Sequence, residues 1–254
     1  MYKLMTIDER KEVSLEILKK IDDLCKNNAI SYYLAYGTLL GAVRHNGFIP
    51  WDDDIDIWIP MEQYDKFLAL IEKENNYDVL YFPKNNGWDM LFAKISDKRT
   101  VMKEHQCDSF EKRGVAIDVF PLVNYESDTW YRNVVSYSNL LILCRTKKFE
   151  KGLKGLIKRI IAIITPEVKV YEKMHKMLNI PKTENVIGLF TPYSKDRVSF
   201  KREWFLPRKH KFENFEFVIP NGYDNVLTNL YGDYLTPPPD DKRNSGHCVD
   251  AYWK

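Results

Sequence analysis

A run of carboxylates that continues into a strand pattern is the feature that most constrains this chain. The run is Trp51-Asp52-Asp53-Asp54-Ile55-Asp56-Ile57, in which Asp and Ile alternate from residue 54 onward. Alternation with a period of two predicts a β-strand with one polar face and one apolar face. Asp54 and Asp56 therefore share a face, roughly 7 Å apart along the backbone, close enough to converge on one ion or a pair of ions.

A second predicted strand, 115–120, carries an acidic residue where an apolar one is usual. Asp118 lies between Ile117 and Val119, and a buried acid normally needs a cation or a metal beside it. Carboxylate oxygens are hard ligands that select Mg²⁺ or Mn²⁺. We therefore predict Asp54, Asp56 and Asp118 as metal ligands of an enzyme that transfers a phosphoryl-type group. Residues 52–54 alone would be more typical of a solvated acidic loop.

The segment before the acidic strand has the features of a phosphate-binding turn. An apolar stretch at 31–36 predicts a short buried strand that stops at Gly37, and 39–44 predicts one or two helical turns. Gly37 and Thr38 then supply backbone N–H groups at a helix N-terminus, which suits a phosphate. A lone Gly-Thr is weak evidence, and its value comes from its position before the acidic strand.

The rest of the chain predicts a mixed α/β fold with a helical second half. Thr6 and Glu9 form a capping-box pattern that opens an amphipathic helix, and apolar periodicity predicts a further helix at 64–71. Further strands are predicted at 77–82 and 91–96, and Pro60 should end the acidic strand. Helical stretches follow from 128 to about 178, the third starting near Pro166. We predict a catalytic core at 1–125, a helical subdomain at 126–185, and a C-terminal segment, 186–254, that packs back on the active site.

Composition excludes several classes of protein. Lys and Arg number 38 against 36 Asp and Glu, so the bulk charge does not predict a nucleic acid partner. The start of the chain has no signal-peptide pattern, and no window is apolar enough to span a bilayer. Four scattered cysteines, without metal or disulfide spacing, indicate reduced thiols and a cytoplasmic protein; they are Cys25, Cys107, Cys144 and Cys248.

At this point the motifs resemble a known family. Gly37-Thr38-Leu39-Leu40-Gly41-Ala42-Val43-Arg44-His45 followed by Gly47-Phe48-Ile49-Pro50-Trp51-Asp52-Asp53-Asp54-Ile55-Asp56 closely resembles the signature of the LicD family. This family includes bacterial phosphocholine transferases and the fukutin-related alditol-phosphate transferases. Other matching segments are Ala93-Lys94, residues 117–122, residues 219–224 and residues 230–234, with the prolines, Lys242, Arg243 and His247 that follow.

The resemblance implies a fold, a reaction and roles for residues. It implies a nucleotidyltransferase-type mixed sheet flanked by helices, with magnesium on Asp54, Asp56 and Asp118 and phosphates at Gly37-Thr38. It also implies CDP-choline as the donor, with CMP as the leaving group. The acceptor would be a sugar hydroxyl of a cell-surface polysaccharide, such as lipopolysaccharide or a teichoic acid precursor. Asp52 is a candidate base toward the acceptor hydroxyl.

Cationic and aromatic residues are candidates for binding the donor. Arg44 and Lys94 suit a diphosphate, with an ordinary surface cation as the competing interpretation. Lys242, Arg243 and His247 follow the triple proline, on a loop that could fold over the site, and a solvated basic segment is the alternative for them. Aromatic faces would recognise choline, although packing in the core is the more usual role of such residues. These aromatic candidates are Trp51, Trp58, Trp88, Tyr223 and Tyr231.

Residues 147–164 form a basic amphipathic pattern in which lysines accompany aliphatic residues at helical spacing. Such a helix can rest on an anionic membrane surface, which would place the protein peripherally at the inner face of the cell membrane, or bind an acceptor's phosphates. The more usual arrangement places the apolar stripe in the core and the lysines in water, and we expect that arrangement here.

Alternatives to phosphocholine transfer stay open from the sequence. The metal motif does not distinguish choline phosphate from ribitol or glycerol phosphate. A different class, nucleotidyl transfer from an NTP with pyrophosphate release, would be favoured by a basic groove. A non-catalytic binding protein on the same fold would predict the loss of one metal carboxylate, and all three are present.

Overall fold

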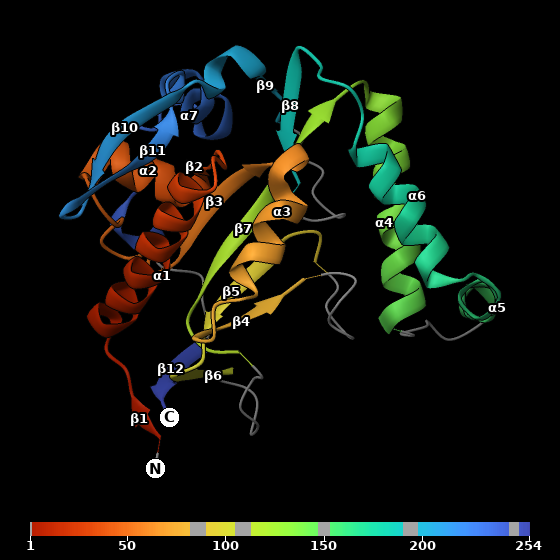
Figure 1. Cartoon of the computed structure of the whole chain (residues 1–254), viewed down its shortest axis with the longest axis horizontal. Coiled ribbons are helices and arrows are strands. Elements are labelled where there is room, and N and C mark those ends of the chain that lie inside the picture. The colour runs from red at the N-terminus through yellow and green to blue at the C-terminus, as the bar shows by residue number, and fades with distance from the viewer. Residues whose placement is uncertain (1, 82–89, 105–112, 147–152, 190–197, 244–248) are drawn as a thin grey trace.

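A mixed β-sheet forms the centre of the protein. The computed structural model describes residues 2–81, 90–104, 113–146, 153–189, 198–243 and 249–254. The sheet has the strand order β2-β3-β7-β5-β4, and β8 and β9 extend it from β7 (Figure 1). β3 and β7 are parallel, and the other neighbouring pairs are antiparallel. The strands are β2 (Tyr33–Leu34), β3 (Ile55–Pro60), β4 (Tyr77–Leu80), β5 (Ala93–Asp97), β7 (Ala116–Tyr125), β8 (Asn185–Gly188) and β9 (Phe200–Lys201).

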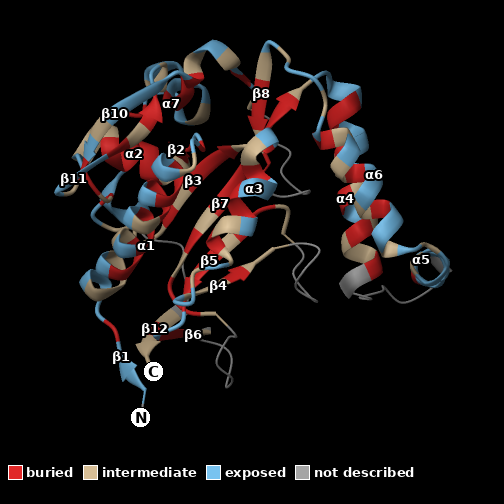
Figure 2. Cartoon of the chain, in the orientation of Figure 1, coloured by how far each residue is buried: buried red, intermediate tan, exposed pale blue. Residues whose placement is uncertain are grey.

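Two helices, α1 (Ile7–Asn27) and α3 (Met61–Ile71), pack against this sheet and against each other. The predicted capping box is confirmed: the Glu9 N–H donates to Thr6 Oγ1 at 3.1 Å, and the Thr6 N–H donates to Glu9 Oε2 at 2.8 Å. Ile17, Leu18 and Ile21 of α1 are fully buried. Figure 2 shows buried residues concentrated in β3, β7 and the inner side of α1. The sheet and these helices therefore share one core and confirm the predicted α/β class.

Several predicted boundaries shift in the structure, for identifiable reasons. The helix predicted at 39–44 is α2 (Tyr36–His45), so the preceding strand is only two residues long. Tyr36 has a left-handed φ of 40°, which turns the chain from β2 directly into α2. The strand predicted at 115–120 continues to Tyr125 because its second half, Leu122–Tyr125, pairs with β8.

The helical second half is present as three helices. These are α4 (Asp128–Thr146), α5 (Leu153–Ile164) and α6 (Glu167–Leu178), with Pro166 immediately before α6. α4 packs against both α5 and α6, and Trp130 Nε1 donates to the carbonyl oxygen of Met177 at 2.9 Å. The division of the chain at residues 125 and 185 stays a prediction, and β8 and β9, which follow the second boundary, are strands of the main sheet.

The C-terminal part of the chain packs in two places, beside the edge of the main sheet that β2 forms and in a small second sheet. A hairpin of β10 (Pro207–Phe212) and β11 (Phe215–Pro220) contacts α2 and β2, and α7 (Tyr223–Tyr231) also packs on α2. Between β9 and β10 lies the short helix η1 (Arg202–Phe205), and after α7 comes η2 (Asp240–Lys242). The last strand, β12 (Val249–Trp253), pairs with β1 (Lys3–Leu4) and with β6 (Thr100–Glu104). This small second sheet joins both ends of the chain to the β5–β6 turn.

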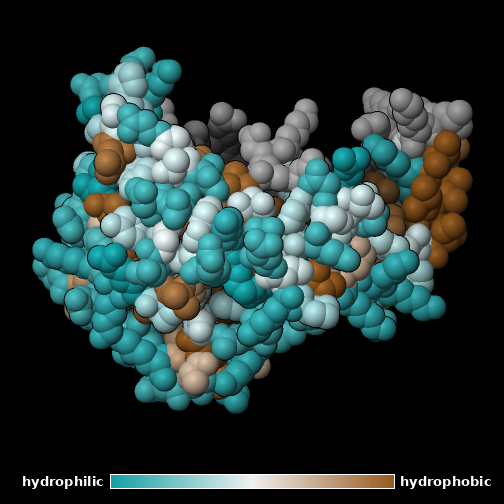
Figure 3. Space-filling view, turned by 90° about the horizontal axis from the view of Figure 1, so that it is seen from above, coloured by the Kyte–Doolittle hydropathy of each residue, from teal (hydrophilic) through white to brown (hydrophobic). Residues whose placement is uncertain are grey.

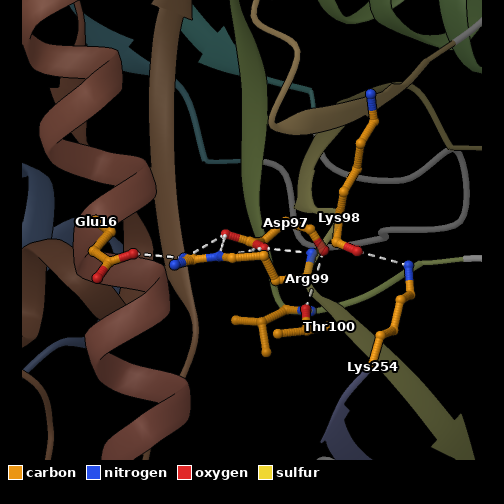
Figure 4. A network of polar contacts seen from close by, with 7 residues as sticks. Glu16, Asp97, Lys98, Arg99, Thr100 and Lys254 are labelled. Carbon is orange, nitrogen blue, oxygen red and sulfur yellow. Dashed lines mark hydrogen bonds and ion pairs between the residues drawn. The ribbon is translucent and has the colours of Figure 1, made fainter.

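That turn is held by a polar network around Asp97 (Figure 4). The Asp97 carboxylate, only 3% exposed, accepts hydrogen bonds from the backbone N–H of Arg99 at 2.8 Å and from the Arg99 guanidinium. Arg99 also reaches Glu16 of α1, whose side chain is 57% exposed. Asp97 is therefore a buried acid with several donors, whereas Glu16 is an exposed partner of the same arginine.

We expect Asp97→Ala to destabilise the protein by about 2–3 kcal/mol, because it removes charge-assisted hydrogen bonds from a buried position. Glu16→Ala, which removes the exposed ion pair of the same arginine, should cost less than about 1 kcal/mol. Urea unfolding of the two variants beside the wild type measures both values. Equal costs for the two variants would contradict the role assigned to Asp97.

Candidate active site

Three charged residues lie in one row across the middle of the sheet. Asp56 of β3 is in register with Asp118 of β7, and Asp118 is in register with Lys94 of β5. Side chains at paired positions of neighbouring strands project from the same face, about 5 Å apart. Lys94 Nζ forms an ion pair with Asp118 Oδ1, and the two side chains are only 16% and 17% exposed. The sheet thus brings together three residues that are far apart in the sequence.

The carboxylates of this row interact electrostatically with one another. Burial raises the pKa of Asp56 well above its usual value, and the negative charges of Asp54 and Asp118 raise it further. The pKa of Asp118 is also raised, first by burial, while the neighbouring Lys94 opposes the shift. Asp52 adds a further negative charge near Asp56. Lys94 and Arg113 thus lower the pKa of Asp118, but the net shift of both carboxylates is upward.

The start of α2 lies directly beside the row of Asp56, Asp118 and Lys94, which we call the acidic row. The Asp56 N–H donates to Thr38 Oγ1 at 2.8 Å, and Thr38 is buried. A Cβ added at Gly37 would lie 3.2 Å from Asp52 Oδ2. The predicted phosphate-binding turn is therefore next to the predicted metal ligands, but the Thr38 hydroxyl is used to hold the first turn of α2 on β3. The backbone N–H groups of this turn suit a phosphate, and the Thr38 O–H, whose oxygen accepts from Asp56, still has a hydrogen to donate.

The loop between α2 and β3 is anchored by residues that the sequence did not single out. Arg10 of α1 pairs with Asp53 at 2.7 Å. Glu213, in the turn of the β10–β11 hairpin, accepts a hydrogen bond from the Phe48 N–H at 2.9 Å. A Cβ at Gly47 would overlap the carboxylate of Glu213, at 2.2 Å from Oε1. Gly47 thus permits the hairpin to fix the loop that leads into the acidic strand.

Cationic and aromatic residues form a rim around this loop. Arg44 Nη1 donates to the carbonyl oxygen of Tyr234 at 2.9 Å. Burial lowers the pKa of Arg44, and the charge of Arg243 lowers it further, so the two guanidinium groups are neighbours. The Arg243 guanidinium also lies 5.2 Å from the ring centroid of Trp51. Two arginines and a tryptophan from separate segments thus meet here, which suits a diphosphate and a flat base or cationic head group.

Tyr231, at the end of α7, links this rim to the acidic row. Burial raises its pKa, and the charges of Asp56, Asp52 and Asp54 contribute to the shift. Tyr231 is nevertheless 44% exposed, so part of this residue is open to solvent. An aromatic face near negative charge is the chemistry that a quaternary ammonium group favours. Among the aromatic candidates, Trp58 is fully buried in the core instead.

Other predicted site residues are placed less closely or lie outside the described residues. Lys242 lies in η2 with an exposed side chain. His247 and Trp88 lie outside the described residues. Tyr223, in α7, lies near Arg208 and His210 of the β10–β11 hairpin. Cys25 and Cys144 are free, buried thiols, while Cys107 and Cys248 lie outside the described segments.

The chemistry of the acidic row fits a divalent cation. Its donors are carboxylate oxygens, which Mg²⁺ prefers. Burial first, and then the neighbouring negative charges, raise the pKa values of Asp56 and Asp118, and a dication would favour their ionised forms. Within the described part of the chain, no three His, Cys, Asp or Glu side chains stand close enough to hold one ion together. Asp118 forms its ion pair with Lys94, so ligation of one ion by Asp54, Asp56 and Asp118 together would require these side chains to move. The metal stays a prediction.

Comparison with known proteins relates the segment that contains this site to a described domain. Residues 29–152, which include the acidic row and the α2 turn, match the family model described as LicD/FKTN/FKRP, nucleotidyltransferase domain. The chain is 28% identical to the lipopolysaccharide cholinephosphotransferase LicD of Haemophilus influenzae, over 98% of this chain and 99% of that protein.

Two shorter matches cover parts of the chain. An uncharacterised protein of Rickettsia typhi is 46% identical over 66 residues, which are 26% of this chain and 21% of that protein. Mannosyltransferase regulator 4 of Saccharomyces cerevisiae is 28% identical over 85 residues, 34% of this chain and 7% of that protein. Residues 29–152 therefore match the LicD/FKTN/FKRP nucleotidyltransferase domain, and nearly the whole chain is similar to a LicD protein.

Proposed function

We propose that this protein is a transferase that moves phosphocholine from CDP-choline to a hydroxyl group of a lipopolysaccharide-type glycan and releases CMP. The observation that carries the reaction type is the row of Asp56, Asp118 and Lys94 beside the first turn of α2. The choice of phosphocholine is supported by the full-length relative, whose name is lipopolysaccharide cholinephosphotransferase.

In this reaction the acceptor oxygen forms a bond to the phosphorus that carries choline, and the bond from that phosphorus to the CMP oxygen breaks. The acceptor hydroxyl loses its proton, for which Asp52, beside Gly37, stays the candidate base. Asp54, Asp56 and Asp118 would hold Mg²⁺, which supplies positive charge against the phosphate oxygens. Arg44 and Arg243 would stabilise the diphosphate of the donor and the charge that develops on CMP.

Recognition of the head group is proposed to involve the exposed aromatic surface of Tyr231. Tyr231 is the aromatic candidate whose pKa is raised by burial and by the charges of three carboxylates, Asp56, Asp52 and Asp54. A trimethylammonium group placed there would contact a π face and lie near negative charge. Ribitol and glycerol phosphates carry hydroxyls instead of a cation, so this combination favours choline.

A substrate panel tests the proposal directly. We expect the purified protein with Mg²⁺ and lipopolysaccharide to release CMP from CDP-choline, at least about tenfold faster than from CDP-ribitol or CDP-glycerol, and to stop when EDTA is added. Choline phosphate should appear on the glycan in equal amount. CMP release only from CDP-ribitol or CDP-glycerol would assign another alcohol phosphate. Pyrophosphate release from CTP or ATP would overturn the proposal in favour of nucleotidyl transfer.

A further inference from the structure

Helix α5 is oriented opposite to the arrangement expected from its sequence. Gly155 is buried and Ala162 is half-buried; these two residues lie seven positions apart, on one side of the helix. Because α5 packs against α4, this small-residue side is the one that meets the protein. The aliphatic side therefore faces away from the core, and our expectation of an apolar stripe packed in the core is wrong.

The outward side is a continuous aliphatic surface. Two adjacent stripes at spacing i, i+4, i+7 run along it, and each residue in them is exposed: Leu156 54%, Ile160 50% and Ile163 73%, then Ile157 50%, Ile161 38% and Ile164 71%. Val168, in the first turn of α6, is also 66% exposed. Figure 3 shows this apolar patch along the edge of the molecule occupied by α5. Single exposed aliphatic residues need no explanation, but a contiguous patch of this kind marks an interaction surface.

The charges on α5 indicate what kind of partner covers this surface. Lys158 and Arg159 are exposed and lie on the two flanks between the small-residue side and the aliphatic side. No acidic residue occurs in Leu153–Ile164. Long basic side chains at the edges of an apolar face can extend to phosphate groups while the aliphatic residues enter hydrocarbon.

The same charges disfavour a second copy of this helix as the partner. Two α5 helices packed face to face would each bring basic residues and no acidic residue to the pair, so their charges would repel. The aliphatic surface is also wider than the narrow seam of a coiled coil, and twelve residues are short for a stable helix pair. A broad apolar face with basic flanks fits a flat, anionic surface.

We propose that α5 docks the protein on the surface of an anionic phospholipid bilayer, with its aliphatic side in the interface and Lys158 and Arg159 on lipid phosphates. No helix among the described residues is long and apolar enough to cross a membrane. The contact proposed for α5 is peripheral, because twelve helical residues are too few to cross a bilayer. It is independent of the reaction proposed above, because no residue of the acidic row or its rim lies on α5.

Vesicle flotation tests this contact. The full chain should float with phosphatidylcholine vesicles that contain about one-third phosphatidylglycerol at low salt, and much less with pure phosphatidylcholine or at high salt. Ile163→Asp/Ile164→Asp should weaken partitioning more than about 100-fold, because two largely exposed aliphatic side chains are replaced by charged ones. Lys158→Gln/Arg159→Gln should weaken partitioning to the anionic vesicles by roughly 25-fold, about fivefold for each lost cation.

A matched control separates the patch from overall charge. Leu4→Asp/Leu206→Asp makes the same chemical change at positions that are 55% and 61% exposed, outside α5, and should leave flotation nearly unchanged. All variants should retain the wild-type circular dichroism spectrum, and CMP release with soluble substrates should not change. Absence of flotation for the wild type, or equal flotation of Ile163→Asp/Ile164→Asp, would overturn the proposal. So would a wild-type dimer in sedimentation velocity that this double variant converts to a monomer without any vesicle binding.

Discussion

Replacing Asp54, Asp56 or Asp118 with asparagine is expected to reduce transfer by about 10³-fold or more while the fold stays intact. Each change keeps the shape of the side chain but removes the charge needed to hold Mg²⁺ near the phosphates, a loss of several kcal/mol of transition-state stabilisation. The comparison of kcat, with saturating CDP-choline and a range of Mg²⁺ concentrations, measures this loss.

For Asp56, the substitution by asparagine should reduce transfer but maintain or raise the stability of the metal-free protein. The pKa of Asp56 is raised by burial and by Asp54 and Asp118, which means that the ionised form is disfavoured in the folded protein relative to the unfolded chain. Asp56→Asn removes this cost, so the variant should unfold at the same or a higher urea concentration than the wild type without metal. Asp78→Asn, on the half-exposed β4 residue that pairs with Lys98, is the control and should change neither activity nor stability. Near-normal activity in any one of the three variants would exclude that residue as an essential ligand.

The second large effect is expected at Lys94. Its ammonium group is the near partner of Asp118, and both side chains are mostly buried. Lys94→Met should destabilise the metal-free protein by about 2–4 kcal/mol, because it leaves a buried carboxylate without its partner. It should also lower kcat by about 10²-fold or more, since one of the positive charges near the transferring phosphate is lost.

A double variant separates these two consequences. Lys94→Met/Asp118→Asn removes both charges and should recover most of the lost stability in urea unfolding, but it should stay inactive. Lys94→Arg keeps the charge and should retain most of the stability, with reduced activity because a planar guanidinium does not replace a compact ammonium. If Lys94→Met kept a wild-type kcat, Lys94 would serve only to balance Asp118 in the free protein.

Local sequence patterns were sufficient to predict the two strands that carry the carboxylates of the site. The alternation of Asp and Ile after residue 53 predicted β3, and an acid between Ile117 and Val119 predicted a charged position inside β7. These signals are local, because a strand's period of two depends only on neighbouring residues. The capping box of α1 is of the same kind and is also observed.

The partners of those residues came from contacts between distant segments. Nothing near Asp118 in the sequence indicates that Lys94 lies in register with it, because register depends on how β5 and β7 pair. Arg10, Glu213 and Tyr231 reach the site from α1, the β10–β11 turn and α7. Hydrophobic periodicity indicates which side of a helix is apolar, but not whether the rest of the protein covers that side. For this reason the expected burial of the aliphatic side of α5 is wrong.

The sequence by itself determined the α/β class, the acidic strand and the family motif around it, because these depend on short-range periodicity and on side-chain chemistry. The tertiary structure decided that Asp56, Asp118 and Lys94 stand in one row, and that Arg44 and Arg243 meet at its rim. It also decided that the small side of α5, not its aliphatic side, meets the protein. Strand register and helix orientation are set by the packing of the whole chain, so no local pattern contains them.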